Sequence, residues 1–182
     1  MSLTSGICRG CRDNCGGIKT IYVADLNAVD WSTLTTGTSG EITGLELTSG
    51  NDWYEFQTNK YSSSWTQTIN VSIENGTKFY QTEISAAFGK MDQEMRNTIE
   101  EAAKGELVII VLDNNDKLWL IGENHNGAYV SGGSLATGQA STDMNGATIT
   151  FACEMKSAAN TVVPTAQGAL ETALAEASCS AN

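Results

Sequence analysis

The chain concentrates its reactive side chains at the N-terminus, where three of its five cysteines, Cys8, Cys11 and Cys15, fall within eight residues. Closely spaced thiolates are typical zinc ligands, but a structural zinc site takes four ligands in a tetrahedron. A fourth ligand would have to come from Cys153, Cys179, His125 or a neighbouring subunit. The three cysteines are therefore candidate metal ligands, and the alternative is free or subunit-linking thiols on an extended arm.

Other residues suited to chemistry are sparse. His125 is the only histidine and lies in the polar turn "ENHNG", which is typical of a surface loop. The acidic run "DNND" at 113–116, with Glu123, suggests calcium, but it lacks EF-hand spacing, and Asp/Asn-rich hairpin turns form for local reasons. No nucleophile motif, phosphate-binding loop or HExxH motif is present. We therefore expect no catalytic residues, no cofactor and no enzymatic activity.

Charge and hydropathy restrict the function further. The 182 residues carry a net charge of −11 with a pI near 4.4, so the basic surface of a typical nucleic-acid binder is absent. No apolar run reaches the roughly 18 residues of a membrane helix, and the first residues lack the apolar core of a secretory signal. Five cysteines cannot all pair within one chain. We expect reduced thiols and no membrane contact.

Hydrophobic periodicity divides the chain into an arm, one domain and a tail. Residues 1–17 show no periodicity, residues 18–163 read as strands with one helix, and residues 164–182 form an Ala/Glu-rich tail with little to bury. Period-two patterns predict strands in the segments beginning at 18, 41, 52, 77 and 147 and around Trp65, and a short strand near Tyr129. Residues 30–40 and the Gly-rich residues 131–146 read as polar loops.

The middle of the chain gives the clearest predictions. Met91, Met95, Ile99 and Ala102 recur at helical spacing, which predicts an amphipathic helix over 90–104 that packs on the core and stops at Gly105. "ELVIIVL", the turn "DNND" and "KLWLIG" predict a hairpin over 106–122, with a first strand buried on both faces. The predicted fold is mainly β, a sandwich or barrel of about eight strands with one flanking α-helix.

Three stretches resemble a known family. "GGIKTIYVADL", "FYQTEISAAFGKMDQEMRNTIEEAAKGELVIIVLDNNDKLWLIG" and "TGQASTDMNGATITF" occur in the order found in virion structural proteins of tailed phages that infect Bacteroidetes, crAss-like phages included. The similarity covers roughly residues 14 to 155, and the middle stretch is its most specific part. Such proteins often begin with a Cys or a small polar cluster before the Gly-Gly, and the three cysteines here are more than that pattern predicts.

The resemblance implies a tail-tube-type subunit without catalytic residues. Such subunits form hexameric rings whose strands join into a continuous inner barrel and whose loops and arms contact the next ring. Residues 131–146, residues 30–40 and the N-terminal arm would then mediate stacking, with other tail or neck proteins as partners. An acidic lumen would let DNA pass without adhering. The expected location is the virion tail, after assembly in the host cytoplasm.

Two other functions fit the same sequence. One is a monomeric ligand-binding β-barrel whose Trp and Tyr residues line a pocket. The other is a small metal-binding protein built on Cys8, Cys11 and Cys15. The oligomeric state distinguishes the tail-tube-type subunit from the monomeric ligand-binding barrel. The metal content tests the metal-binding protein.

Overall fold

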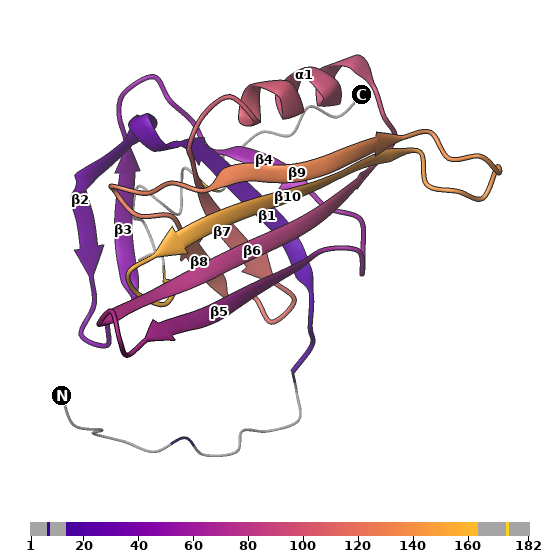
Figure 1. Cartoon of the computed structure of the whole chain (residues 1–182). Coiled ribbons are helices and arrows are strands. Elements are labelled where there is room, and N and C mark those ends of the chain that lie inside the picture. Colours follow the sequence, from indigo (N-terminus) through magenta and orange to yellow (C-terminus); the bar gives the residue numbers. More distant parts are fainter. Residues whose placement is uncertain (1–6, 8–13, 164–173, 175–182) are drawn as a thin grey trace.

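Two β-sheets packed face to face make up the domain in the computed structural model, which describes residue 7, residues 14–163 and residue 174 (Figure 1). Sheet A has the strand order β2-β3-β11-β8-β7-β1-β4, and sheet B has the order β5-β6-β10-β9. The strands of sheet A are β1 (Ile18–Asp25), β2 (Val29–Thr36), β3 (Ile42–Leu47), β4 (Tyr54–Gln57), β7 (Leu107–Asp113), β8 (Leu118–Ile121) and β11 (Asn160–Val162). Those of sheet B are β5 (Ser64–Ser72), β6 (Thr77–Gly89), β9 (Tyr129–Ala136) and β10 (Gly146–Met155).

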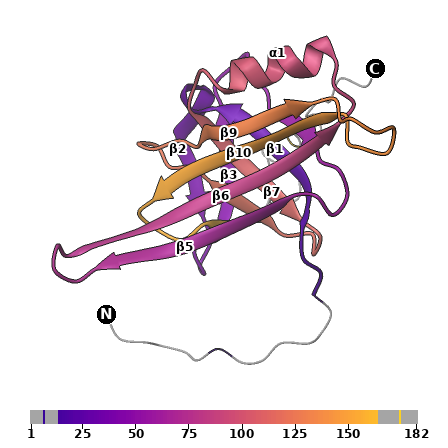
Figure 2. The same cartoon turned by 45° about the vertical axis from the view of Figure 1, so that its right-hand side comes forward.

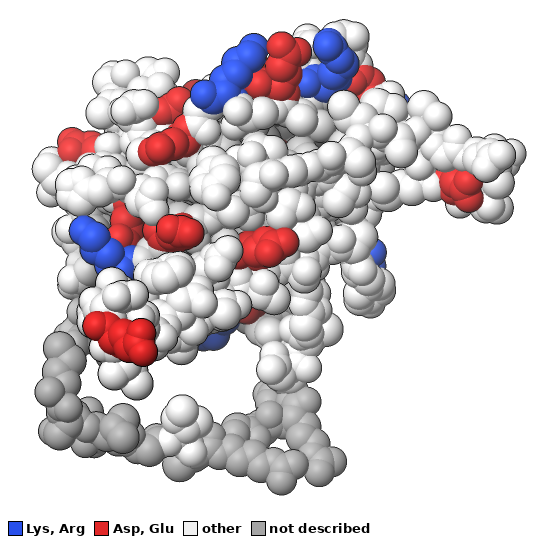
Figure 3. All heavy atoms as spheres, viewed as in Figure 1, with Lys and Arg blue, Asp and Glu red and all other residues white. Residues whose placement is uncertain are grey.

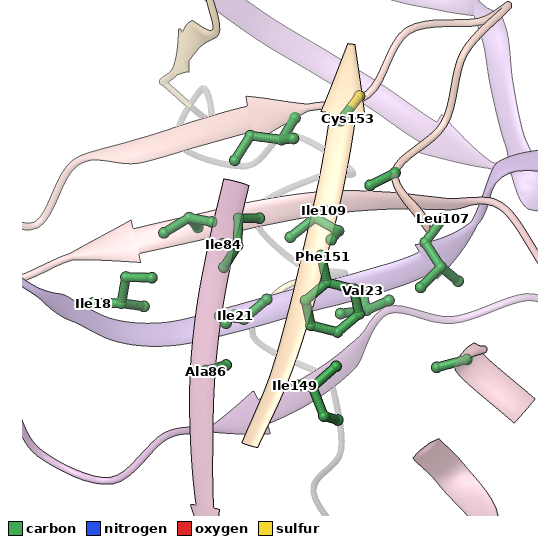
Figure 4. Packing of buried hydrophobic residues seen from close by; sticks show 14 of the residues in the cluster. Ile18, Ile21, Val23, Ile84, Ala86, Leu107, Ile109, Ile149, Phe151 and Cys153 are labelled. Atoms are coloured by element: carbon green, nitrogen blue, oxygen red, sulfur yellow. The ribbon is translucent and has the colours of Figure 1, made fainter. Parts of the chain in front are cut away.

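The main core fills the space between the sheets. Alternate residues of β6 and β10, such as Ile84 and Phe151, point toward β1 and β7 and meet Ile21 and Ile109 (Figure 4). These four side chains are fully or almost fully buried. Period-two alternation directs every second side chain of these strands into this layer, which is why the sequence pattern predicts the strands.

A second core covers the opposite face of sheet A. Val108 and Ile110 of β7 lie in it with Leu45, Trp53 and Leu174, whereas Leu107, Ile109 and Val111 face the main core. β7 is therefore buried on both faces, as its uninterrupted apolar sequence predicts. The hairpin that joins it to β8 is confirmed as well.

Helix α1 (Gln93–Ala102) lies across the mouth of the sandwich, near edge strands β4 and β9 (Figure 1). The Asp92 side chain caps its first turn by accepting a hydrogen bond from the Met95 N–H at 2.8 Å. Ala102 is buried in the main core, and Met95 and Ile99 pack against it, which confirms these three members of the predicted apolar stripe. The fourth, Met91, lies before the helix, which begins at Gln93. A short 3₁₀ turn, η1 (Leu26–Ala28), links β1 to β2.

Several sequence predictions are wrong in detail. Residues 30–36 belong to strand β2 and are not a loop, because they pair with β3 as its partially exposed neighbour. Residues 131–136 extend β9, which leaves only 137–145 as the loop to β10. The helix ends at Ala102 with a cap at Ala103, so Gly105 does not stop it. Within the described residues there are eleven strands, against about eight predicted.

Candidate assembly surface

The outer face of sheet B is a broad polar surface. In β10, Ile149, Phe151 and Cys153 point into the core, so Thr150 and Glu154 point outward. Paired residues share a face of the sheet, and the β6 partners of Thr150 and Glu154 are Ser85 and Gln81. This face also carries Thr66, Thr68, Glu83 and Thr148.

Charge on this face is sparse and of one sign. The four strands of sheet B contain three charged residues, Lys78, Glu83 and Glu154. Lys78 pairs with Val71, whose side chain is on the opposite face from that of Glu83, so the outer face carries two carboxylates and no cation. In Figure 3, which shows this sheet in front, acidic side chains and no basic ones lie over its middle, while both kinds gather along α1.

Neither edge of sheet B has a strand partner among the described residues. β5 pairs only with β6, and β9 pairs only with β10. Natural edge strands usually carry charged residues or proline that block pairing with another chain. The sequences of β5, "SWTQTINVS", and β9, "YVSGGSLA", contain neither. One register shift in the β9–β10 ladder is the only irregularity along these two edges. In the part of the chain that the structure describes, two long edges thus lack both a partner strand and the residues that would block one.

The strand directions suit repetition around an axis. All neighbours in sheet B are antiparallel, and the sheet has four strands, so β5 and β9 run in opposite directions. A copy rotated about an axis roughly along the strands would place its β5 beside β9 in antiparallel orientation. The antiparallel alternation of strand directions would therefore continue from one copy to the next.

A groove opens beside helix α1. We call it the α1–β4 groove; it has a volume of about 680 Å³ and lies between α1, the free edge of β4 and the end of β6. Its apolar lining is Tyr54, Phe56, Phe88, Met95, Ile99 and Ile149. The charged residues around it are Glu55, Lys90, Asp92 and Glu94. Ile99 and Ile149 also line a smaller hollow of about 310 Å³ between the helix and β9.

The β5–β6 hairpin has exposed apolar side chains that the sequence pattern does not reveal. Period two correctly predicts a strand with Ile69 and Val71 in alternate positions, although Ile73 lies in the turn after it. These three residues are 61%, 63% and 93% exposed. The signal available in the sequence was length, because β6 has 13 residues while β7, which lies across the core from it, has seven. The longer strand must extend past the core that its partner can cover.

The structure does not assemble a metal site from the candidate ligands that it describes. Cys15 is exposed, Cys153 is buried, and His125 is exposed in the turn after β8. No three His, Cys, Asp or Glu side chains within the described residues lie close enough to share an ion. Cys8, Cys11 and Cys179 lie outside the described residues.

Burial makes Cys153 a poor ligand in its own right. Desolvation, together with a smaller contribution from the nearby Glu123, Glu154 and Glu106 carboxylates, raises the pKa of its thiol to about 12. The Sγ atom lies 3.7 Å from the Asn126 carbonyl oxygen, to which it donates. A metal ligand must be a thiolate, and this thiol stays protonated in the folded protein.

The acidic turn at 113–116 has a structural role. One oxygen of Asp113 accepts hydrogen bonds from the N–H groups of Asn115 and Lys117 at 2.8 and 2.9 Å, and the other accepts from Trp119 Nε1 at 3.2 Å. Asp116 forms an exposed ion pair with Lys19. These contacts explain the acidic turn by local structure, and no ion need be invoked.

Glu123 is also engaged in local structure. Its Oε1 accepts hydrogen bonds from the N–H groups of Lys156 and Ser157 at 3.0 and 3.3 Å. The Ser157 hydroxyl donates to the same oxygen at 3.2 Å. These hydrogen bonds connect the segment after β10 to the β8–β9 turn, in which Glu123 lies.

The β7–β8 hairpin turn at residues 113–116 also holds the start of the domain in place. Asn115 accepts from the Cys15 N–H and donates to the Cys15 carbonyl oxygen, both at 2.8 Å. Asn114 donates to the Gly16 carbonyl oxygen at 2.7 Å, and its own N–H bonds to the Gly17 carbonyl oxygen at 3.2 Å. The segment that leads into β1 is thus fixed by the "DNND" turn, which assigns that turn a role the sequence did not indicate.

Comparison with known proteins gives no family for this chain. No protein-family model matches it, and no curated protein matches it. No helix among the described residues has the length and apolar character needed to cross a membrane.

Proposed function

We propose that the chain is a structural subunit of a phage tail or neck, which forms rings that stack into a DNA-conducting tube. The observation that carries the proposal is the pair of unprotected edges, β5 and β9, on one four-stranded antiparallel sheet. Pairing β9 of one copy with β5 of the next joins the sheets side by side. Repeated around an axis, this contact closes the sheets into a barrel.

The dimensions of such a barrel fit the function. Six copies would supply 24 strands, and with a spacing of roughly 4.8 Å and the usual tilt of about 40°, the barrel would be roughly 50 Å across. The outer face of sheet B would line the lumen with hydroxyl and amide groups and two carboxylates per copy, Glu83 and Glu154. A surface without cations does not hold the phosphate backbone, so DNA can slide along it.

A monomeric ligand-binding barrel is the second candidate, and the α1–β4 groove is the observation that favours it. The space between the sheets, where such a barrel would hold its ligand, is filled by core side chains. Of the Trp and Tyr residues expected around a pocket, Tyr54 alone lines the groove. The groove is therefore weaker support than the two open edges.

Blocking one edge tests the proposal. Thr66→Lys combined with Thr68→Lys places two charges on the edge strand β5, where lysine prevents strand pairing. Thr148→Lys combined with Thr150→Lys places the same charges on the same face but on the interior strand β10. Light scattering after size exclusion and negative-stain imaging would then be compared for the two variants and the unchanged chain.

We expect rings from the unchanged chain and from the β10 variant, and monomers from the β5 variant. Equal assembly of both variants would reject edge pairing. A monomeric unchanged chain of 19.3 kDa would favour the ligand-binding barrel.

A further inference from the structure

The end of the β5–β6 hairpin extends past the rest of sheet B. β10 pairs with β6 only as far as Tyr80, where Met155 is its partner, and the hairpin continues to its turn at residues 73–76. We call residues 69–79 the hairpin overhang. Figure 2 shows it projecting well beyond the other strands.

A polar contact marks where the main core ends and the overhang begins. Gln67 Nε2 donates to Thr82 Oγ1 at 2.8 Å, and the Ala159 N–H donates to Gln67 Oε1 at 3.1 Å. Ile69 is the next side chain on the same face of β5, and it is 61% exposed. Nothing among the described residues covers the overhang beyond this point.

The β5 strand of the overhang is amphipathic, whereas on the β6 strand Lys78 shares the apolar face with Val71, and Phe79 shares the opposite face with Asn70. Ile69 and Val71 lie on the face that carries Trp65 in the core, and Ile73 follows at the turn. Asn70 and Ser72 occupy the opposite face. The three aliphatic side chains expose on the order of 400 Å² of surface, which approaches the largest apolar patch of a typical monomer and about half of one partner's share of a stable interface.

The α1–β4 groove lies at the other end of the same sheet. Phe88 and Gly89, the last residues of β6, line it, whereas the first residue of β6 is at the hairpin turn. The 13 residues of β6 place the two sites roughly 40 Å apart along the strand. A contact between overhang and groove must therefore join two copies, and each copy keeps one unused site for the next.

Size and charge suit this pairing. A volume of about 680 Å³ falls in the range of pockets that bury a small ligand and can receive a few aliphatic side chains. Around the groove, three carboxylates oppose one lysine, and the overhang carries one anion, Glu74, and one cation, Lys78. Lys78 pairs with Val71 and so approaches with the apolar face. The overhang therefore has no net charge, so it is not repelled by the acidic residues around the α1–β4 groove.

We propose that the hairpin overhang of one copy inserts Val71 and Ile73 into the α1–β4 groove of a second copy. The contact is head to tail along the strand direction, so each added copy leaves one overhang and one groove available for the next. Its role as the stacking contact between rings rests on the proposed function, in which rings form through the β5 and β9 edges. The contact itself needs only a second copy of this chain.

Two variants disable one partner surface each. Val71→Asp with Ile73→Asp charges the overhang, and its control, Asn70→Asp with Ser72→Asp, adds the same charge on the opposite face. Thr98→Trp fills the groove, and its control, Asn97→Trp, adds the same side chain at an exposed helix position outside the groove lining. All four changes lie at exposed or half-exposed positions, and urea unfolding checks that each variant is folded.

Negative-stain imaging and light scattering of the variants, alone and mixed, give the test. We expect each disabled variant alone to form single rings, and each control to form stacks like the unchanged chain. An equimolar mixture of the two disabled variants should form pairs of rings and nothing longer, because only one productive contact remains. Stacking by the charged-overhang variant alone, or no pairing in the mixture, would overturn the proposal.

A photo-crosslinking residue in place of Ile73 provides a second measurement that does not depend on the folding of the variants. We expect mass spectrometry to find crosslinks to the peptides containing residues 54–57 or 93–99 of another copy. Crosslinks between two overhangs would instead indicate a symmetric contact and reject the groove. If the disabled variants form single rings, ring formation through the β5 and β9 edges stands independently of this contact. If the unchanged chain forms linear chains without rings, ring formation is rejected and the overhang–groove contact is kept.

Discussion

At the scale of single residues, Gly17 shows how closely the start of the domain fits its anchor. Its φ of +106° lies in the region that favours glycine, and an added Cβ would lie 2.8 Å from Asn114 Nδ2. Gly16, one residue earlier, has no atom within 4 Å of the same position and has no positive φ. Two adjacent glycines therefore have different structural requirements.

We expect Gly17→Ala to lower the free energy of unfolding by about 1–2 kcal/mol, because it strains the backbone and displaces the Asn114 amide. Gly16→Ala should change it by less than about 0.5 kcal/mol. Urea unfolding of the two variants and the unchanged chain checks this. Similar stability of the two variants would contradict the fixed geometry of residues 15–17.

The buried thiol of Cys153 makes stability depend on pH. Its pKa is about 12 in the folded protein, against an ordinary value of 9.0. The folded state therefore holds one proton more than the unfolded state between these values, and stability falls as the pH rises through this window. Below pH 9 both states are protonated, and the stabilising contribution of the neutral thiol is complete.

We expect Cys153→Ala to be destabilising at pH 8, because it removes a buried side chain. The difference from the unchanged chain should shrink by roughly 1.4 kcal/mol for each pH unit above 9. Urea unfolding under reducing conditions at pH 8, 9 and 10 measures this, with Cys15→Ala as an exposed-thiol control. A difference that stays constant from pH 8 to 10 would contradict the raised pKa.

At the scale of elements, helix α1 depends on its first turn. The helix has ten residues, and helices this short are marginal without capping or packing. Asp92 supplies the cap, and the ion pairs of Glu100 with Arg96 and Lys104 are exposed and contribute little. The position of the helix over the groove thus rests on Asp92 and on the packing of Met95, Ile99 and Ala102.

We expect Asp92→Ala to cost about 1 kcal/mol of stability, since the Met95 N–H loses its partner. Asp92→Asn keeps an acceptor at the same place and should lower the free energy of unfolding by only about 0.3 kcal/mol. Urea unfolding followed by circular dichroism compares the two. If both substitutions cost the same, the carboxylate acts through its charge and not through the cap.

The same elements show what the sequence could predict. Periodicity predicts β1, β6, β10, α1 and the β7–β8 hairpin, because each buries one regular face or, for β7, both. It misses β2 and most of β9, whose residues from 131 onward are polar or Gly-rich and mostly exposed. Sheet pairing by backbone hydrogen bonds leaves little trace in such side chains.

The candidate surfaces were harder to predict than the elements. Ile69 and Val71 have the pattern of core residues, and only the end of β10 at Met155 leaves them uncovered. The open edges likewise depend on which strands are neighbours, a property of topology that residue spacing does not encode. The acidic composition indicated an anionic surface, and the register assigns Glu83 and Glu154 to it.

At the scale of the whole molecule, position and not total charge should decide how DNA meets the protein. Glu83 and Glu154 are the only charged residues on the outer face of sheet B, whereas Glu46 and Asp52 are exposed on β3 and before β4, in or beside sheet A. Replacing either pair by lysine changes the net charge by +4, from −11 to −7. The two double variants therefore match in net charge and differ only in where the change lies.

In the proposed tube, Glu83→Lys with Glu154→Lys turns the lumen cationic, while Glu46→Lys with Asp52→Lys leaves it acidic. We expect assembled tubes of the first variant to retain duplex DNA at 50 mM salt and to lose about 10³-fold in affinity by 200 mM, as for about six phosphate contacts. Tubes of the second variant and of the unchanged chain should retain none. Co-sedimentation of fluorescent DNA with the tubes measures this, and equal retention by both variants would mean that the outer face of sheet B does not line the channel. Retention by the first variant alone would connect two carboxylates placed by strand register to the passage of DNA, because a channel that must release its cargo requires a wall to which phosphate does not bind.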